Sequence, residues 1–164
     1  MIFSLGVSVP SAAQEPDGFF CVATGAETLG YYQQLFPLLK EAGVSFVRIF
    51  PEWAHIQPRQ GEWNFELADS ILKSAEENGL RVFGIFLYLA PWASSAPPGT
   101  TDWTALTRTF PIKDIGYWRD YVRGVVNRYK GKVRYWEVYN EFGSFSINGT
   151  PKDYAELVRN AYRV

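Results

Sequence analysis

Residues 133–141 read Val-Arg-Tyr-Trp-Glu-Val-Tyr-Asn-Glu, which is the composition of a β-strand that ends in two polar residues, Asn140 and Glu141. Three other apolar runs precede this stretch, and an amphipathic stretch separates each run from the next. Such an alternation predicts βα units whose strands form a parallel sheet. The expected strands are Gly18–Thr24, Val44–Phe50, Arg81–Leu89 and Val133–Asn140.

The stretches between these runs carry the start and stop signals of helices. Asn64, Asp114 and Thr150 are good N-cap residues, and Pro151 follows at a first helical position. A glycine stands where each of the first three helices should end. Pro37 interrupts the first helical pattern and predicts either a kink or a late start. We expect helices over Thr28–Ala42, Asn64–Asn78 and Asp114–Lys130, and a fourth from Thr150 onward.

Four βα units make half of an eight-stranded TIM barrel, so the expected fold class is α/β, a (β/α)4 half barrel. At 164 residues, the chain is expected to form one domain. Residues 1–17 should form an N-terminal strand, Ile2–Val9, and a turn, and residues 18–164 the four units. The alternative for the first segment is a retained export signal, because Ser11-Ala12-Ala13 has the small residues of a cleavage site.

A half barrel leaves two strand edges unpaired and one face of its sheet partly uncovered. We therefore expect a homodimer or a larger homo-oligomer in which the copies cover one another's open edges. The alternative is that the sequence is a fragment of a longer barrel.

Composition excludes several classes of protein. A net charge of −1 provides no positive field for nucleic acid. The single cysteine, Cys21, excludes an intrachain disulfide, and we expect it to be buried as a small apolar residue. With one histidine there is no cluster with zinc-ligand spacing, so we expect no metal and no cofactor. The longest apolar stretch, Val82–Ala93, is too short to cross a bilayer. A soluble protein follows, and its location inside or outside the cell stays open.

Two long loops, Phe50–Asn64 and Leu89–Asp114, follow the second and third strands. They lie at the carboxyl ends of the strands, where parallel α/β proteins place their sites, and loops of this length are usually functional. Aromatic residues make up 17% of the chain. Tryptophans in these loops offer flat apolar faces that suit sugar rings, with packing in the core as the alternative.

Three segments, Glu41–Pro58, Tyr88–Ala93 and Arg128–Glu141, resemble the clan A glycoside hydrolases. The closest resemblance is to family 39, the xylosidase and iduronidase group, and it covers Gly18 to the C-terminus. It implies a β-xylosidase or a related β-glycosidase, with an oligosaccharide or polysaccharide as the partner.

The resemblance implies that Glu141 is the acid/base of a retaining enzyme, and that the nucleophile is a glutamate at the end of strand seven. Glycoside cleavage needs both carboxylates, and four βα units contain no strand seven. The expected function is therefore the acid/base half of a glycosidase site, with weak or absent activity of the chain alone. The alternatives are a non-catalytic carbohydrate-binding half barrel and a purely structural half barrel that self-assembles.

Arg48 and Asn140 are candidates for substrate binding beside Glu141. Asn140 can donate to a sugar hydroxyl, and Arg48 matches the arginine that clan A enzymes place near the nucleophile. Side-chain alternation points Arg48 and Glu137 into the barrel together, where a buried charge needs a partner. A structural ion pair between them is therefore the alternative to a substrate role for Arg48.

The remaining candidates for substrate contact follow the second, third and fourth strands. Trp53 and Trp92 would act as stacking platforms or pack in the wall, Tyr88 would bond a hydroxyl through its phenol, and His55 would contact substrate or only its neighbours. Tyr139 stands where the family commonly has Trp, and Phe142 where it has Pro, which changes the wall of the site. Glu52 near the same face is expected to be a solvated charge rather than a second acid.

Overall fold

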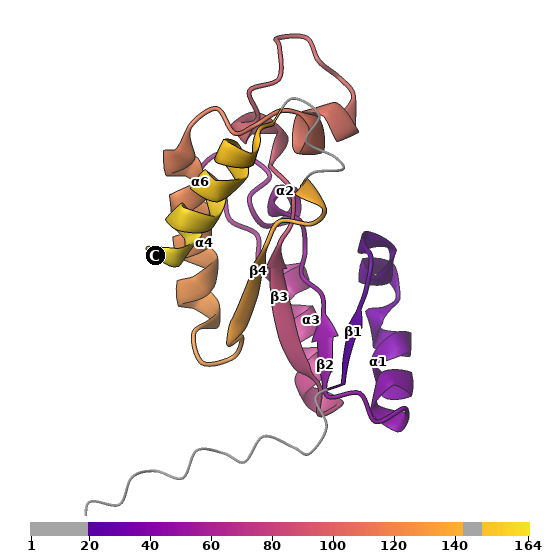
Figure 1. Ribbon diagram of the computed structural model, residues 1–164. Coiled ribbons are helices and arrows are strands. Elements are labelled where there is room, and N and C mark those ends of the chain that lie inside the picture. The colour runs from indigo at the N-terminus through magenta and orange to yellow at the C-terminus, as the bar shows by residue number, and fades with distance from the viewer. Residues whose placement is uncertain (1–19, 143–148) are drawn as a thin grey trace, which may run out of the picture.

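The computed structural model describes residues 20–142 and 149–164, and these form a parallel sheet covered by helices (Figure 1). The strand order is β1-β2-β3-β4, with every neighbouring pair parallel. The predicted α/β class and the four parallel strands are therefore confirmed. The expected strand Ile2–Val9 lies outside the described residues. The strands are β1 (Cys21–Ala23), β2 (Phe46–Arg48), β3 (Arg81–Phe86) and β4 (Tyr135–Val138).

Strands β3 and β4 end earlier than the sequence predicted. Tyr139 has a φ of 66° and Tyr88 a φ of 46°, and a residue in this left-handed conformation cannot continue an extended strand. β4 therefore ends at Val138, and Asn140 and Glu141 lie on the turn beyond the strand instead of on it.

Among the described residues, four helices of ten or more residues and several short helical turns lie between or after the strands. The elements are η1 (Ala26–Gly30), α1 (Tyr32–Glu41), α2 (Trp53–Ile56), α3 (Glu66–Glu77), η2 (Pro91–Ala93), η3 (Ala105–Thr109), α4 (Ile115–Tyr129) and α6 (Pro151–Tyr162). The short helix α2 lies inside the first long loop and was not predicted. In the part of the chain that the structure describes, no helix has the length and apolarity needed to cross a membrane.

The predicted helix starts at Asp114 and Thr150 are confirmed by their capping contacts, whereas α3 begins at Glu66 with Phe65, not Asn64, as its N-cap. The Asn64 side chain accepts from the Glu66 N–H at 3.1 Å, and the Asp114 side chain accepts from the Gly116 N–H at 2.7 Å. Thr150 and Asp153 bond each other reciprocally in a capping box. Helix α1 also begins later than predicted, at Tyr32, because the 3₁₀ turn η1 occupies the preceding residues. Pro37 lies inside α1 and not at its start.

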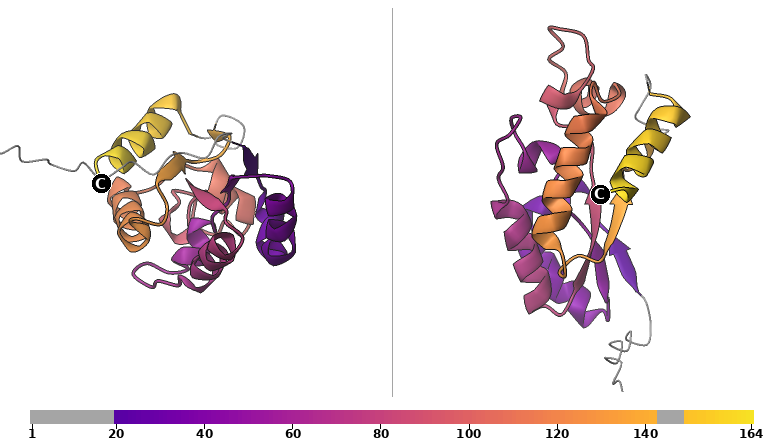
Figure 2. Two further views of the ribbon diagram at one scale, coloured as in Figure 1. Left: turned by 90° about the horizontal axis from the view of Figure 1, so that it is seen from below. Right: turned by 90° about the vertical axis from the view of Figure 1, so that its left-hand side faces the viewer.

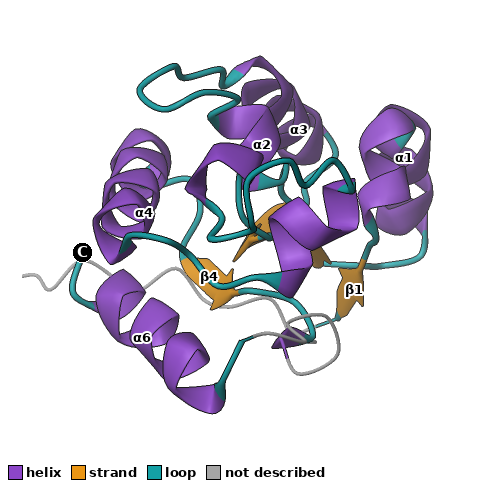
Figure 3. Ribbon diagram, turned by 90° about the horizontal axis from the view of Figure 1, so that it is seen from above, coloured by secondary structure: helices purple, strands orange, loops and turns teal. Residues whose placement is uncertain are grey.

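Side-chain alternation divides the sheet into two faces. Helices α1, α3, α4 and α6 form an arc along one side of the strands (Figures 2 and 3). The face toward the helices, called the helix face here, carries only apolar side chains and a glycine: Val22, Val47, Val82, Gly84, Phe86, Trp136 and Val138. The opposite face, called the inner face, carries Arg48 and Glu137.

Gly84 shows how tightly the helix face is packed. A Cβ at this position would lie 2.4 Å from the Trp136 ring, so only glycine fits beneath that ring. Trp136 in turn stacks on Phe86 with ring centroids 4.6 Å apart. The ring of Phe86 meets Trp118 and Tyr121 of α4 edge-on, which joins the sheet to the helix layer.

Candidate active site

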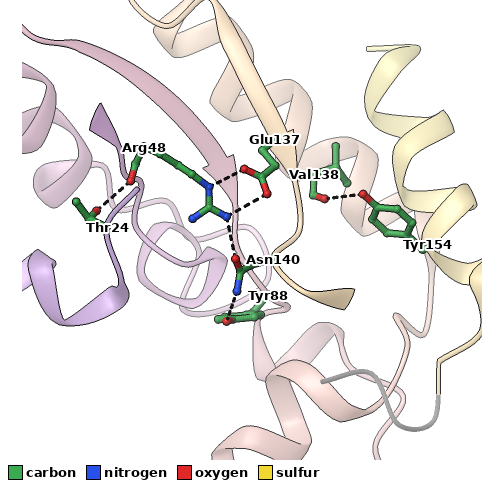
Figure 4. A network of polar contacts seen from close by, with 7 residues as sticks. All are labelled: Thr24, Arg48, Tyr88, Glu137, Val138, Asn140 and Tyr154. Carbon is green, nitrogen blue, oxygen red and sulfur yellow. Dashed lines mark hydrogen bonds and ion pairs between the residues drawn. The ribbon is translucent and has the colours of Figure 1, made fainter. Parts of the chain in front are cut away.

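The polar groups of the inner face converge at the carboxyl ends of β2, β3 and β4 (Figure 4). Arg48 is the last residue of β2, and Glu137 lies on β4. Tyr88 and Asn140 each lie two residues beyond β3 and β4, respectively. These four side chains were separate candidates or alternatives in the sequence, and the parallel register brings them together.

A continuous chain of hydrogen bonds links the four side chains. Arg48 Nε donates to Glu137 Oε2 at 2.6 Å, and Arg48 Nη2 donates to Glu137 Oε1 at 3.0 Å. Nη2 also donates to Asn140 Oδ1 at 2.8 Å, and Asn140 Nδ2 donates to the Tyr88 hydroxyl at 3.3 Å. The amide of Asn140 is therefore held at both ends, which fixes the direction in which its nitrogen points.

The predicted ion pair of Arg48 and Glu137 is present in a forked, two-bond geometry. This geometry is stronger and more directional than a single contact. The hydrogen bonds to Glu137 raise the pKa of the Arg48 guanidinium above its ordinary value. Arg48 thus serves as a permanently charged support for Asn140, and its direct contact with substrate stays a prediction.

The backbone around this network is strained at three residues. Within the described part of the chain, Tyr88, Tyr139 and Glu141 are the residues other than glycine with positive φ, and all three follow β3 or β4. Bulky residues adopt this conformation only where their surroundings enforce it, and such strain gathers at functional sites. Glu141, with a φ of 46°, is exposed at the end of this turn.

Trp53 does not have the role that was predicted for it. Its side chain is 0% exposed, stacks on Tyr121 at 4.6 Å and donates from Nε1 to Gln57 Oε1 at 2.9 Å. A sugar platform needs an open ring face, so we correct this assignment to a core residue. The expected packing alternative describes Trp53, because α2 turns its ring toward α4 and away from the loop surface.

The other candidates for substrate contact differ in their burial and in their partners. Trp92 is half-buried and donates from Nε1 to the Gln57 carbonyl at 2.9 Å. Tyr139 is buried, and its ring meets Tyr88 and Phe142 edge-on. His55 is exposed on α2. Substrate contact by Trp92, Tyr139 or His55 remains a prediction.

Glu52 and Cys21 differ from what the sequence led us to expect. Glu52 is 4% exposed and its Oε1 lies 3.4 Å from Arg108 Nη2, so it is a buried, paired carboxylate and not a solvated charge. Cys21 is exposed because β1 is an edge strand, so its predicted burial was wrong. Burial also raises the pKa of the Cys21 thiol, although only part of the group is covered.

Sequence reasoning missed Arg108, which belongs to the π-helical turn η3 in the second long loop. Its guanidinium lies 3.9 Å from the centre of the Tyr88 ring while it pairs with Glu52. No pattern marks this residue in the sequence, because its partner Glu52 lies 56 positions away. Within residues 20–142 and 149–164, no group of three or more His, Cys, Asp and Glu side chains is arranged to hold a metal ion.

The solved structures with a similar fold include glycosidases. A family 39 glycoside hydrolase from Bacteroides cellulosilyticus aligns with a TM-score of 0.63 and 22% identity over 88% of this chain and 28% of its own. A family 1 β-glucosidase from Thermotoga maritima aligns with a TM-score of 0.58 and 17% identity over 84% of this chain and 32% of its own. At these identities the likeness shows the fold alone, which is that of part of a TIM barrel.

Several curated relatives by sequence are xylanases. An endo-1,4-β-xylanase/feruloyl esterase from Xylanibacter ruminicola is 34% identical over 105 residues, and a β-1,4-xylanase from Dictyoglomus thermophilum is 28% identical over 144 residues. The matched regions cover 62% and 83% of this chain, but only 13% and 36% of the relatives. This chain therefore spans a small part of their length.

The model of glycosyl hydrolase family 10 matches residues 50–155, which run from the end of β2 through most of the site to α6. This family belongs to clan A, so the resemblance to that clan is confirmed. A family 39 enzyme is among the structural relatives, and the closer resemblance to family 39 is not confirmed. By sequence, the chain belongs to glycosyl hydrolase family 10.

Proposed function

We propose that the carboxyl end of this sheet is the acid/base side of a retaining β-glycosidase site, with Glu141 as the proton donor. The observation that carries the proposal is the fixed Asn140 amide next to Glu141, held by Arg48 from one end and by Tyr88 from the other. The xylanase relatives support a β-1,4-linked xylan or xylo-oligosaccharide as the substrate.

In this proposal, protonated Glu141 donates its proton to the glycosidic oxygen as the bond to the sugar breaks. The carboxylate then takes a proton from the water that completes hydrolysis. Asn140 has two N–H groups on its amide nitrogen. One donates to Tyr88, and the second can donate to a sugar hydroxyl, a contact that strengthens in the transition state.

Retaining chemistry also needs a nucleophilic carboxylate about 5 to 5.5 Å from the acid. The resemblance assigns this group to the seventh strand of a barrel, which is not one of the four strands here. Glu52 does not replace it in our proposal, because Arg108 pairs with it and it is almost completely buried. We therefore expect slow hydrolysis by the chain alone.

The test compares Glu141→Gln with the unchanged chain on aryl β-xylosides whose phenols differ in acidity. Proton donation matters most for poor leaving groups, so Glu141→Gln should lower the rate about 100-fold or more on the least acidic phenol and less on the most acidic one. Glu62→Gln is the matched control, because Glu62 is an exposed carboxylate paired with Arg59.

Equal rates for the unchanged chain and Glu141→Gln on every substrate would contradict the proposal. Calorimetry with xylobiose and xylotriose separates the remaining alternatives. Heat of binding without hydrolysis would indicate a carbohydrate-binding half barrel, and neither heat nor hydrolysis would leave only a structural role.

We also propose that two copies associate through the inner face. Among the described residues of this face, Cys21, Ala23 and Tyr135 are exposed, and Phe20 beside β1 is 61% exposed. Light scattering across a hundred-fold range of concentration should show a mass that rises toward twice the monomer. A constant monomer mass would contradict self-association.

A further inference from the structure

The π-helical turn η3 touches the ends of β2, β3 and β4, although it lies in the middle of a long loop. The Leu89 N–H donates to the Thr107 carbonyl at 2.9 Å. The Tyr139 hydroxyl lies 3.4 Å from the Thr107 carbonyl and 3.5 Å from the Arg108 carbonyl. Through Arg108, the turn also reaches Glu52, four residues after β2.

These contacts fall on the strained part of the site. Tyr88 and Tyr139 have positive φ, and Leu89 follows Tyr88 directly. A strained backbone persists only where neighbouring groups hold it in place. Because η3 contacts both tyrosines, it supplies part of that support, and π-helical turns often occur at functional sites.

Arg108 connects the turn to the amide that we place beside the acid. Its guanidinium covers the Tyr88 ring at 3.9 Å, and the Tyr88 hydroxyl accepts from Asn140 Nδ2 at 3.3 Å. The carboxylate of Glu52, 4% exposed, holds the guanidinium in that place. A buried carboxylate needs such a partner, so neither group is free to move independently.

We propose that Arg108 is a positioning residue, which fixes the Tyr88 ring and thereby the direction of the Asn140 amide beside Glu141. A planar guanidinium can lie flat on a ring and pair with a carboxylate at once, whereas an ammonium group is a point charge. Lysine at this position therefore keeps the charge but loses the flat contact. The catalytic consequence rests on the function proposed above, whereas the positioning itself does not.

The first test is nuclear magnetic resonance of the Asn140 side-chain amide, assigned by its disappearance in Asn140→Asp. Arg108→Lys should shift these signals toward those of a free asparagine, because the contacts described above join the two side chains through Tyr88. Arg59→Lys is the control, because Arg59 pairs with Glu62 on the exposed surface, and it should leave the signals unchanged. Unchanged Asn140 signals in a folded Arg108→Lys chain would overturn the proposal.

A second variant covers the case in which Arg108→Lys does not fold. Glu52→Gln combined with Arg108→Gln leaves no unpaired charge in the interior, but it removes the cation from the Tyr88 ring. The same displacement of the Asn140 signals is expected in this chain. Signals at their original positions would again contradict the role of Arg108.

Hydrolysis provides a third readout. If Glu141→Gln shows that the chain is a glycosidase, Arg108→Lys should lower kcat about 10-fold or more and change KM by less than about 3-fold, because misplacement acts on the transition state. An unchanged kcat would overturn the catalytic consequence. If the chain does not hydrolyse xylosides at all, the function proposal fails, and the amide signals alone decide the positioning.

Discussion

The helix face of the sheet is apolar along its whole described length, whereas the inner face carries the ion pair of Arg48 and Glu137. On the helix face, Trp136, Phe86 and the α4 aromatic residues interlock around a glycine. Apolar burial of this kind is the main favourable contribution to folding. A partly buried ion pair, by contrast, adds little net stability over an apolar pair of the same shape. The difference indicates that the helix face contributes most to the stability of the fold, and it agrees with the site that we propose on the inner face.

The largest effect is expected from Trp53→Ala, which removes a fully buried ring from the helix layer. We expect the free energy of unfolding to fall by about 3–5 kcal/mol, as measured by urea denaturation. Trp103→Ala is the control, because Trp103 is 50% exposed, and it should change stability by less than about 1 kcal/mol. A stable Trp53→Ala chain that had lost only sugar binding would restore Trp53 to the site.

The next effect tests the packing on Gly84. Gly84→Ala places a methyl group 2.4 Å from the Trp136 ring and should lower the free energy of unfolding by about 1–3 kcal/mol. Gly30→Ala is a matched control, since a Cβ there meets no atom within 4 Å. Equal stability of the two variants in thermal unfolding would show that the helix face can accommodate a methyl group beneath the Trp136 ring.

Glu137→Gln tests how much the ion pair on the inner face contributes to stability and to ligand binding. Its carboxylate is 36% exposed, so the loss of the ion pair should lower stability by only about 1 kcal/mol. The effect on function should be larger: affinity for xylotriose, measured by calorimetry, is expected to fall about 10-fold, or ~1.4 kcal/mol, because Arg48 then holds Asn140 less firmly. A greater loss of stability than of affinity would remove the contrast between the faces.

The smallest effect is expected at the surface pair of Asp69 and Arg128, between α3 and α4. Arg128 Nε donates to Asp69 Oδ1 at 3.2 Å, and the Tyr129 hydroxyl donates to the same oxygen at 2.9 Å. The hydrogen bond from Arg128 lowers the pKa of Asp69 below its ordinary value. Both side chains of the pair are nearly half exposed, so Asp69→Asn should lower stability by less than about 1 kcal/mol at neutral pH.

The pH dependence of that difference has a definite direction. A carboxyl whose pKa is lower in the folded state stabilises the fold above its unfolded pKa, about 3.9. This contribution is lost as the pH falls from about 4 through the lower folded-state pKa. The stability gap between the unchanged chain and Asp69→Asn should therefore close in acid urea denaturation series. A gap that stayed constant from pH 7 to pH 2 would contradict the role of the Asp69 charge.

Much of the architecture was predictable because its signals are local. Asp114 and Thr150 cap their helices through contacts two or three residues away, and the residues that follow them repeat with helical spacing. The ion pair of Arg48 and Glu137 followed from alternation along two strands. The strand ends were less predictable, since no local signal marks the positive φ of Tyr88 and Tyr139, and both residues contact the distant turn η3.

The sequence by itself determined the four βα units, the parallel sheet and the position of Asn140 and Glu141 at the end of the fourth strand. Those features depend on periodicity and on capping, which act over a few residues. Only the tertiary structure decided that Trp53 is a core residue, that Glu52 is buried, and that Arg108 lies on Tyr88. Each of these features depends on which side chains from separate loops contact one another at one end of the sheet. Such long-range contacts are determined by the packing of the whole fold.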